Sequence, residues 1–345
     1  GDVIKLDDFS RFKVFIGEPI DDLEDTYQEL VDLGCNLIIG PPVSCPKQGY
    51  SEEQLMDICK DVDAFIGMAR EKITENVINA SPKLRIICKY GNGVDNINVK
   101  AASEHDVIVS NAPVHNMTVA EFAFSLMLSV LKKIPRNMEY LKNGNWRDAS
   151  TMGNELYKKT VGIVGFGAIG KQLAKRLQGW DVNVLVCDPL GTNEIAGLFG
   201  ATLVDWDTVF ESSDIISVHL PLMDSTRKAI GSYEFKKMKK SAILVNTSRG
   251  PVIDENALIE ALLNNEIGGA GLDVFMSEPI SADNPLREME NVVLTPHVAG
   301  STTESLRRIA EQTTQNCIKA LKGEIPEFVV NKDVIPKWKE LYSNK

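Results

Sequence analysis

Three residues in the last third of the sequence are of the types that move a proton on a hydroxyl-bearing carbon. Arg249, Glu278 and His297 each closely follow an apolar run that predicts a buried β-strand. An imidazole can take or return a hydroxyl proton, a neighbouring carboxylate favours its protonated form and fixes its tautomer, and an arginine can pair with a substrate carboxylate. Each residue alone could be structural. Because ligands bind at the carboxyl ends of parallel strands, we expect all three to meet at one sheet edge.

A glycine-rich segment upstream of these residues predicts dinucleotide binding. Gly165, Gly167 and Gly170 follow an apolar run at the G-x-G-x-x-G spacing, and Asp188 ends the next apolar run. The first glycine allows a tight turn, the second lets a pyrophosphate approach the backbone, and the third lets the following helix pack against the sheet. Asp188 can accept hydrogen bonds from the ribose hydroxyls, and no arginine follows it to pair with a 2′-phosphate. We therefore expect NAD and not NADP.

The elements that must position these residues alternate between strands and helices in two series. This alternation predicts parallel sheets with right-handed crossovers, so the fold class is α/β, with two Rossmann/flavodoxin-like parallel-sheet domains and a cleft between them. We expect an NAD-binding domain over residues 115–299 and a discontinuous substrate-binding domain over residues 1–114 and 300–345. Ser301 and Glu304 predict a capping box for a helix that runs to about Lys322 and covers the first domain. The predicted strands are residues 13–16, 36–39, 64–66, 84–88 and 107–109, then 160–164, 182–186, 215–218, 242–245, 269–272 and 292–294.

Composition and charge narrow the class of protein. A formal net charge of −11 over 345 residues argues against nucleic acid or an anionic membrane as a main partner. The most apolar stretch, residues 117–134, contains charged residues and predicts a buried helix, not a membrane span. Six cysteines without a C-x-x-C pair, and no secretory leader pattern, favour a cytoplasmic protein with reduced thiols and no metal, zinc being possible only by tertiary coincidence.

These motifs, taken in order from about Phe12 to Lys322, resemble the D-isomer-specific 2-hydroxyacid dehydrogenase family. The resemblance implies that His297 is the catalytic acid and base, that Glu278 tunes it, and that Arg249 orients the substrate. It also implies that the backbone N–H groups of Asn92 and Gly93 hold the substrate carboxylate. The motifs that carry it are Gly91-Asn-Gly-Val-Asp-Asn96, the glycine-rich segment, His219-Leu-Pro221, residues 246–250, Gly271-Leu-Asp-Val-Phe275, Glu278-Pro279 and Pro296-His297.

The same resemblance implies a set of cofactor contacts. Asp273 would contact the nicotinamide amide, and His219, which the residues alone mark as a structural histidine at a strand end, would line the cofactor side. Of the remaining histidines, His105 lies in a polar loop, and His115 lies near the proposed hinge, where it could face the substrate. The implied cofactor-binding residues are Gly165, Gly167, Ala168, Ile169, Gly170, Asp188, His219, Pro221, Thr247, Ser248, Asp273 and His297.

The substrate is less closely defined than the chemistry. Glu278 stands where formate dehydrogenases place Gln, and Asn92 stands where phosphite dehydrogenases place Lys. The likeness is strongest to D-3-phosphoglycerate dehydrogenases, because residues 65–74 resemble their phosphate-contacting segment. Met68 replaces an arginine there, whereas Arg70 and Lys72 remain, and Arg70 is the expected phosphate contact.

The sequence leaves open the substrate and function of the protein and the role of the helix expected over residues 118–133. Lactate, glycerate or hydroxypyruvate, and glyoxylate remain alternative substrates, and an NAD(H)-sensing corepressor-like binding protein remains an alternative function because the same core serves both. The helix expected over residues 118–133 is apolar on most faces. It suits a homodimer interface, as in relatives, or an intrachain core helix.

Overall fold

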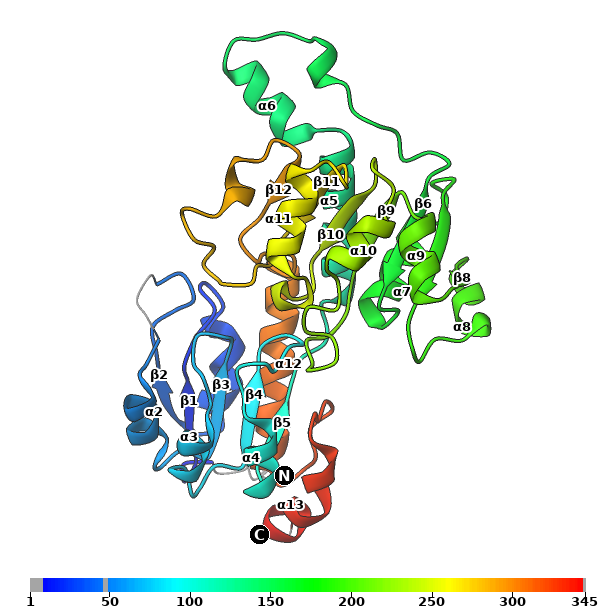
Figure 1. Cartoon of the computed structure of the whole chain (residues 1–345). Helices are drawn as coiled ribbons and strands as arrows, with labels where there is room; N and C mark the ends of the chain where they lie inside the picture. Colours follow the sequence, from blue (N-terminus) through cyan, green and yellow to red (C-terminus); the bar gives the residue numbers. More distant parts are fainter. Residues whose placement is uncertain (1–8, 46–48, 344–345) are drawn as a thin grey trace, which may run out of the picture. The chain divides into compact units, whose positions relative to one another are not determined.

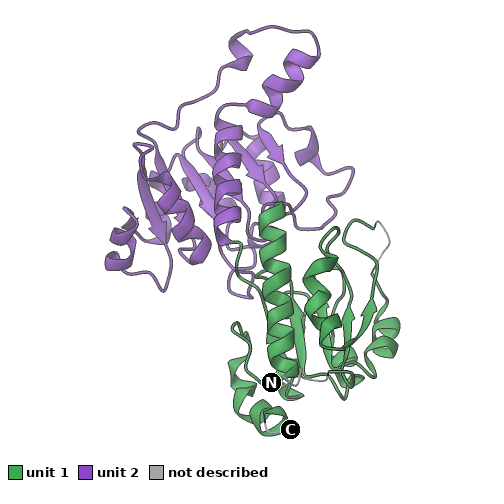
Figure 2. Cartoon of the chain, turned by 180° about the vertical axis from the view of Figure 1, so that it is seen from behind, with its two compact units in different colours: residues 1–115, 302–345 green, residues 116–301 purple. Residues whose placement is uncertain are grey.

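A computed structural model describes residues 9–45 and 49–343. The chain divides into two compact units (Figure 2): unit 1 comprises residues 1–115 and 302–345, and unit 2 comprises residues 116–301. Each unit is an α/β structure built on its own all-parallel sheet. The predicted fold class of two parallel-sheet domains is confirmed.

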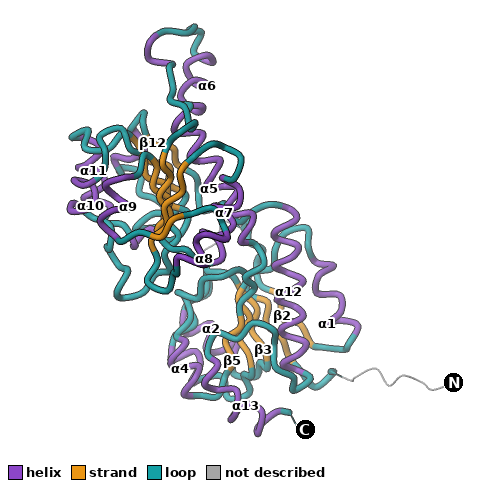
Figure 3. The backbone as a smooth tube through the Cα atoms, turned by 90° about the vertical axis from the view of Figure 1, so that its right-hand side faces the viewer, coloured by secondary structure: helices purple, strands orange, loops and turns teal. Residues whose placement is uncertain are grey.

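Unit 1 is built on a five-stranded sheet with the order β2-β1-β3-β4-β5 (Figure 1). Side chains alternate along β1, so Val14 and Ile16 face one layer of helices and Phe15 faces the other. Helices lie on both sides of the strands (Figure 3), with α1 and α12 on one face and α2, α3 and α4 on the other. The strands are β1 (Lys13–Ile16), β2 (Asn36–Ile39), β3 (Ala64–Gly67), β4 (Ile86–Lys89) and β5 (Ile108–Ser110). The helices are η1 (Glu24–Tyr27), α1 (Gln28–Asp32), α2 (Glu52–Cys59), α3 (Glu75–Asn79), α4 (Val99–Glu104), α12 (Thr303–Leu321), η5 (Lys332–Val334) and α13 (Ile335–Tyr342).

The C-terminal segment completes unit 1 from a distant part of the sequence. Helix α12 buries Ile309, Cys317 and Leu321 in the same core as the strands. Beyond it, the buried Asn331 accepts a hydrogen bond from the backbone N–H of Val109 at 2.8 Å and donates to the carbonyl oxygen of Val107 at 2.9 Å. The edge strand β5 therefore has its backbone groups satisfied by a segment more than 200 residues away.

Unit 2 is built on a seven-stranded sheet with the order β12-β11-β10-β9-β6-β7-β8. The order reverses between β6 and β9, which makes their carboxyl ends the switch point where doubly wound folds bind ligands. The strands are β6 (Thr160–Val164), β7 (Asn183–Cys187), β8 (Thr202–Leu203), β9 (Ile215–Val218), β10 (Ile243–Asn246), β11 (Gly269–Leu272) and β12 (Val292–Leu294). The helices are α5 (Asn116–Leu131), α6 (Ile134–Lys142), η2 (Ala149–Thr151), α7 (Ala168–Leu177), α8 (Asn193–Leu198), α9 (Trp206–Ser212), α10 (Ser232–Lys237), η3 (Gly250–Val252), α11 (Glu255–Leu263) and η4 (Pro285–Glu288).

Local details depart from the sequence-based expectations. Strand β8 was not predicted, because two residues are too short to show a periodicity. The capping-box prediction is wrong by one residue: the side chain of Thr302, not Ser301, caps helix α12 by accepting a hydrogen bond from the N–H of Ser305 at 3.2 Å. Helix α5 packs against β10, β11 and α7 within unit 2, as an intrachain core helix does.

Candidate active site

The glycine-rich turn after β6 combines tight packing with one open position. Gly165 has φ +93°, and a Cβ there would lie 2.6 Å from the carbonyl oxygen of His219. A Cβ on Gly170 would collide with the carbonyl oxygen of Gly165, whereas a Cβ on Gly167 would meet nothing within 4 Å. Gly167 is also the N-cap of α7, and no side chain caps its N–H groups. The turn thus has room for a phosphate at the N-terminus of a ten-residue helix.

Asp188 lies against this turn at the carboxyl end of β7. Its Oδ2 accepts a hydrogen bond from the N–H of Phe166 at 2.7 Å, and its Oδ1 accepts one from the N–H of Leu190 at 2.8 Å. Each carboxylate oxygen can accept a second hydrogen bond. The side chain is therefore held beside the glycine turn with acceptor capacity left for a ribose.

Two buried polar atoms on neighbouring strand ends have no hydrogen-bond partner among the described residues. They are Oγ1 of Thr247, which follows β10, and Nδ1 of His219, which follows β9. The other ring nitrogen of His219 lies 2.9 Å from the hydroxyl of Ser217, and burial lowers the pKa of His219 to about 4, so the ring is neutral at pH 7. Unsatisfied buried groups of this kind fit a dinucleotide that supplies their partners.

His297 and Glu278 form the closest pair among the predicted catalytic residues. Nδ1 of His297 lies 2.7 Å from Oε2 of Glu278, and the N–H of Phe275 donates to Oε1 of Glu278 at 3.1 Å. Burial by itself raises the pKa of Glu278, but the hydrogen bond and charge of His297 outweigh it and hold that pKa below its ordinary value. An ionised carboxylate only accepts, so Nδ1 carries the proton and Nε2 is the atom that can exchange one.

Arg249 enters the same region from the loop after β10. The buried Asn246 shapes this loop, because its amide donates to the carbonyl of Arg249 at 3.0 Å and its Oδ1 accepts from the N–H of Ser248 at 2.9 Å. Nη1 of Arg249 donates to the carbonyl of Ser248 at 2.8 Å. Unit 2 thus brings Arg249, Glu278 and His297 to one edge of its sheet.

Asp273 is a buried brace for the segment that carries His297. Its carboxylate accepts hydrogen bonds from the hydroxyl of Thr295 at 2.6 Å and from the N–H groups of Val298 and Ala299 at 2.9 and 2.8 Å. Its backbone carbonyl accepts the N–H of His297 at 2.8 Å. The side chain of Asp273 is fully buried. Its carboxylate therefore holds residues 295–299 in place and is not presented at the surface.

Unit 1 holds Asn92 and Gly93 in the loop after β4. The carbonyl of Gly91 accepts the N–H of Ala112 at 3.0 Å, and the carbonyl of Asn92 accepts the side-chain amide of Asn111 at 2.9 Å. The ring of His115 packs against Gly91, where a Cβ would approach its Cε1 to 3.3 Å. Sequence reasoning gave His115 little weight, although its position three residues after Ala112 could have linked it to this loop.

The side chain of Arg70 forms hydrogen bonds with backbone carbonyl groups of unit 1. Its Nη2 donates to the carbonyls of Pro42 and Val43 at 3.0 and 3.1 Å, and its Nη1 donates to the carbonyl of Pro41 at 3.3 Å. Its Nε lies 3.5 Å from Oε1 of Glu18. These contacts hold residues 41–43 in place and engage Nη1, Nη2 and Nε of the guanidinium within unit 1.

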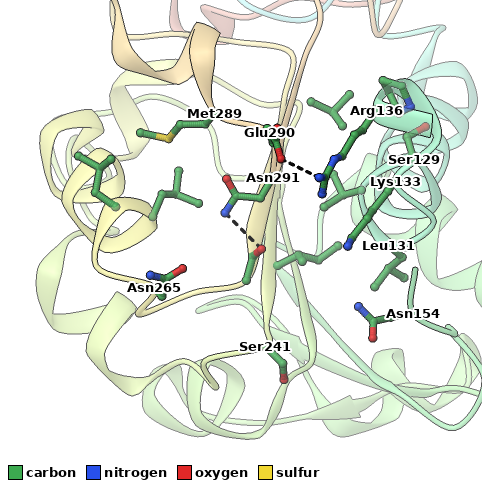
Figure 4. Close-up of a pocket in the computed structure, with 17 residues that line it drawn as sticks. Ser129, Leu131, Lys133, Arg136, Asn154, Ser241, Asn265, Met289, Glu290 and Asn291 are labelled. Atoms are coloured by element: carbon green, nitrogen blue, oxygen red, sulfur yellow. Dashed lines mark hydrogen bonds and ion pairs between the residues drawn. The ribbon is translucent and has the colours of Figure 1, made fainter. Parts of the chain in front are cut away.

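A pocket of about 510 Å³ in unit 2 lies away from all the predicted site residues (Figure 4). Ser241, Gly268 and Asn291 line it, and they precede β10, β11 and β12, so the pocket is at the amino ends of these strands. Figure 4 also shows Arg136 directed at Glu290, an ion pair of 2.9 Å. The pocket is at the wrong edge of the sheet for the chemistry described above.

The described part of the chain has neither the side-chain clusters of a metal site nor a membrane-spanning helix. No group of three or more His, Cys, Asp or Glu side chains there is arranged to hold a metal ion. The six cysteines are free thiols. No helix among residues 9–45 and 49–343 is long and apolar enough to cross a membrane.

Comparison with known proteins identifies the family. The model of the D-isomer specific 2-hydroxyacid dehydrogenase NAD-binding domain matches residues 124–299. This chain belongs to the D-isomer-specific 2-hydroxyacid dehydrogenase family. It is an NAD-dependent D-2-hydroxyacid dehydrogenase, so the predicted family, enzyme class and cofactor are confirmed.

Individual relatives of this dehydrogenase carry different names. A glyoxylate reductase of Korarchaeum cryptofilum is 39% identical over 290 residues, which cover 83% of this chain and 87% of that protein. A D-3-phosphoglycerate dehydrogenase of Methanocaldococcus jannaschii is 41% identical over 293 residues, which cover 84% of this chain but only 56% of that protein. The structure of a D-lactate dehydrogenase of Aquifex aeolicus with NAD and lactic acid superposes with a TM-score of 0.80 at 27% identity, covering 92% of this chain and 98% of that one.

We expect Asp188→Ala to weaken NADH binding by about 10- to 100-fold, since hydrogen bonds to a charged group contribute about 1.5–3 kcal/mol. The preference for NAD over NADP should narrow as well, because the carboxylate no longer repels a 2′-phosphate. Fluorescence titration of both reduced cofactors measures this. Glu194→Ala removes an exposed carboxylate of the same unit and should change neither affinity. An unaltered NAD/NADP preference in Asp188→Ala would show that another group reads the ribose.

Proposed function

We propose that this enzyme transfers a hydride reversibly between NAD and C2 of a small D-2-hydroxy acid, with His297 as the acid and base. The 2.7 Å contact between His297 and Glu278 carries this proposal, because it orients an imidazole at the ligand-binding edge of the unit that matches the NAD-binding domain. NAD, when bound, supplies the hydride acceptor. Side chains and backbone groups of this chain bind the substrate, orient it and transfer the proton.

The residues divide the work according to their chemistry. In oxidation Nε2 of His297 takes the hydroxyl proton of the substrate, and in reduction it returns that proton to the oxygen at C2. Arg249 pairs with the substrate carboxylate and stabilises negative charge on the reacting oxygen. The backbone N–H groups of Asn92 and Gly93 bind the same carboxylate. Unit 1 is thus the substrate-binding domain, and unit 2 is the NAD-binding domain.

The cofactor-binding residues follow the surfaces described for unit 2. The glycine turn with Ala168 and Ile169 would hold the pyrophosphate, and Asp188 would hold the ribose. His219, Pro221, Thr247 and Ser248 would line the nicotinamide side. We assign Asp273 chiefly to positioning His297, because its carboxylate already accepts three hydrogen bonds from residues 295–299.

For the substrate we propose a small unphosphorylated 2-oxo or 2-hydroxy acid of the glyoxylate or hydroxypyruvate kind. The sequence favoured phosphoglycerate through Arg70, but this side chain is engaged by the carbonyls of residues 41–43. Phosphoglycerate remains the second candidate because residues 65–74 resemble the phosphate-contacting segment.

We also propose that the enzyme is a cytoplasmic homodimer that pairs through the α5–α6 region. Beyond α5, unit 2 exposes a series of large apolar side chains on α6 and the following loop, at the top of Figure 1. Exposed apolar surface of this extent is typical of an interface. These side chains are Ile134, Met138, Leu141, Trp146 and Met152.

A turnover screen tests the proposed activity. With NADH we expect reduction of glyoxylate and hydroxypyruvate, and with NAD we expect oxidation of D- but not L-2-hydroxy acids. Absorbance at the NADH band follows both directions. NADH binding without turnover of any acid in the panel would favour the corepressor-like function, and turnover of 3-phosphoglycerate above all other acids would restore phosphoglycerate as the substrate.

Single replacements of His297 and Glu278 should have different effects, because the first removes the proposed base and the second removes only the charge that acts on its pKa. His297→Asn should lower kcat by about 10²–10⁴-fold, the usual contribution of a positioned acid or base, with NADH binding retained. Glu278→Gln removes the negative charge that favours the imidazolium, so the imidazole loses its proton at lower pH. The alkaline limb of reduction and the acidic limb of oxidation should therefore both move to lower pH. Limbs that stay in place, or move in opposite directions, would disprove the pairing.

The dimer proposal predicts that Leu141→Glu converts the enzyme to a monomer, because a charge cannot be buried in an apolar interface without a partner. Sedimentation velocity at several concentrations measures the change. Lys142→Glu, at the exposed neighbouring position, should leave the dimer intact. A wild-type enzyme that sediments as a monomer throughout would refute the proposal.

A further inference from the structure

Glu18 is a buried carboxylate that accepts hydrogen bonds from two backbone N–H groups of one loop. Donors of this kind often bind anionic ligands. Glu18 follows β1 and is 4% exposed. Its Oε2 accepts the backbone N–H of Met68 at 3.0 Å and that of Arg70 at 2.8 Å. Its Oε1 lies 3.5 Å from Nε of Arg70. Two N–H groups of one loop and a guanidinium thus converge on a single internal anion.

This set of donors has the composition of an oxyanion site. Neighbouring backbone N–H groups in a loop after a strand bind phosphates and carboxylates, and arginine adds a charge-assisted contact. The loop belongs to residues 65–74, the segment that resembles a phosphate-contacting one. Asn96 ties it to the proposed carboxylate-binding loop, because its amide donates to the carbonyl of Glu71 at 2.7 Å and to that of Met68 at 3.3 Å. The donor set therefore lies next to the segment that we assign to the substrate.

A second buried carboxyl group makes the same place unfavourable for a further anion. Glu71 is 1% exposed. Burial, and then the charge of Glu18, raise the pKa of Glu71 above its ordinary value, while Arg70 acts in the opposite direction. Burial, and then the charge of Glu71, raise the pKa of Tyr50. A dianionic group approaching here would meet Glu18 already in place and Glu71 beside it.

We propose that Glu18 is a specificity-determining residue, an internal carboxylate that occupies the anion site of unit 1 and so excludes substrates with a phosphate or second carboxylate at the end remote from C2. The substrate class is then a 2-oxo monocarboxylic acid with an uncharged tail. This inference rests on the proposed function for its meaning in catalysis. The occupation of the donor set by Glu18 can be tested without turnover.

The first experiment asks whether removing the internal carboxylate creates an anion site. The variant is Glu18→Ala with Glu71→Gln, because loss of Glu18 lets Glu71 ionise more easily and its charge would mask the effect. Inorganic phosphate is the probe, thermal unfolding is the readout, and saturating NADH is present throughout so that phosphate cannot occupy the glycine-rich turn. We expect millimolar phosphate to raise the Tm of the double variant, since a ligand that binds only the folded state stabilises it. The wild type and Glu24→Ala, which loses an exposed carboxylate of unit 1, should not respond.

A third variant identifies the donors. Adding Arg70→Ala to the double variant should abolish the phosphate response, because Nε of Arg70 is one of the groups that Glu18 releases. An equal response in the wild type, Glu24→Ala and the double variant would reveal non-specific anion binding and overturn the proposal. So would a folded double variant that phosphate does not stabilise.

The second experiment measures selectivity in catalysis. The ratio of kcat/KM for a 2-oxo dicarboxylate, 2-oxoglutarate, to kcat/KM for glyoxylate should rise at least about 10-fold in the double variant, as removal of like-charge repulsion in a binding site predicts. A ratio is unaffected by a smaller folded fraction. Glu24→Gln should leave it unchanged. A constant ratio in the double variant would contradict the proposal, whereas no turnover by any form of the enzyme would contradict the proposed function and leave the thermal experiment to decide the role of Glu18.

Discussion

The proposed catalytic edge of unit 2 depends on one buried carboxylate, that of Asp273. Three donors from residues 295–299 converge on it, and the N–H of His297 is held by the carbonyl of the same residue. His297 has φ +54°, a backbone conformation that a non-glycine residue keeps only when its surroundings impose it. Without this brace the segment would relax, and the imidazole would lose its alignment with Glu278. The buried group thus determines the geometry of the exposed one.

The loop that carries Arg249 shows the same dependence on packing. Gly250 lies so close to the backbone of Phe275 that a Cβ would overlap it, which joins the loop after β10 to the loop after β11. Asn246, the last residue of β10, fixes the turn that leads to Arg249 through hydrogen bonds with the backbone of Ser248 and Arg249. Arg249 and Glu278 are therefore held by two loops that share a backbone contact, and a change at either loop moves both charges. Rigid strand ends, more than the charged side chains themselves, define the distances in this site.

The sequence predicted what depends on local pattern and failed where distant groups meet. The glycine spacing located the turn after β6, and apolar runs located all but one of the strands, because burial leaves a periodic signal. Glu18 and Glu71 carried no such signal: the two carboxyl groups lie more than 50 residues apart, and neither chemistry nor spacing suggests that they are neighbours. Arg70 was predicted as a phosphate contact because its residue type suited one. Only the fold shows that carbonyls of residues 41–43 use its donors.

Because the chain returns to unit 1 only after unit 2 is complete, unit 2 can finish folding first during synthesis. Residues 116–301 form unit 2 without interruption, so this unit can fold as soon as it leaves the ribosome. Unit 1 lacks helix α12 until residues 303–321 are synthesised, and until then the face of its sheet that contains Ile16, Ile66 and Ile86 lacks one of the helices that cover it. The N-terminal domain is thus the later one to be completed. This interval, and not the finished enzyme, is where a chaperone would find apolar surface to bind.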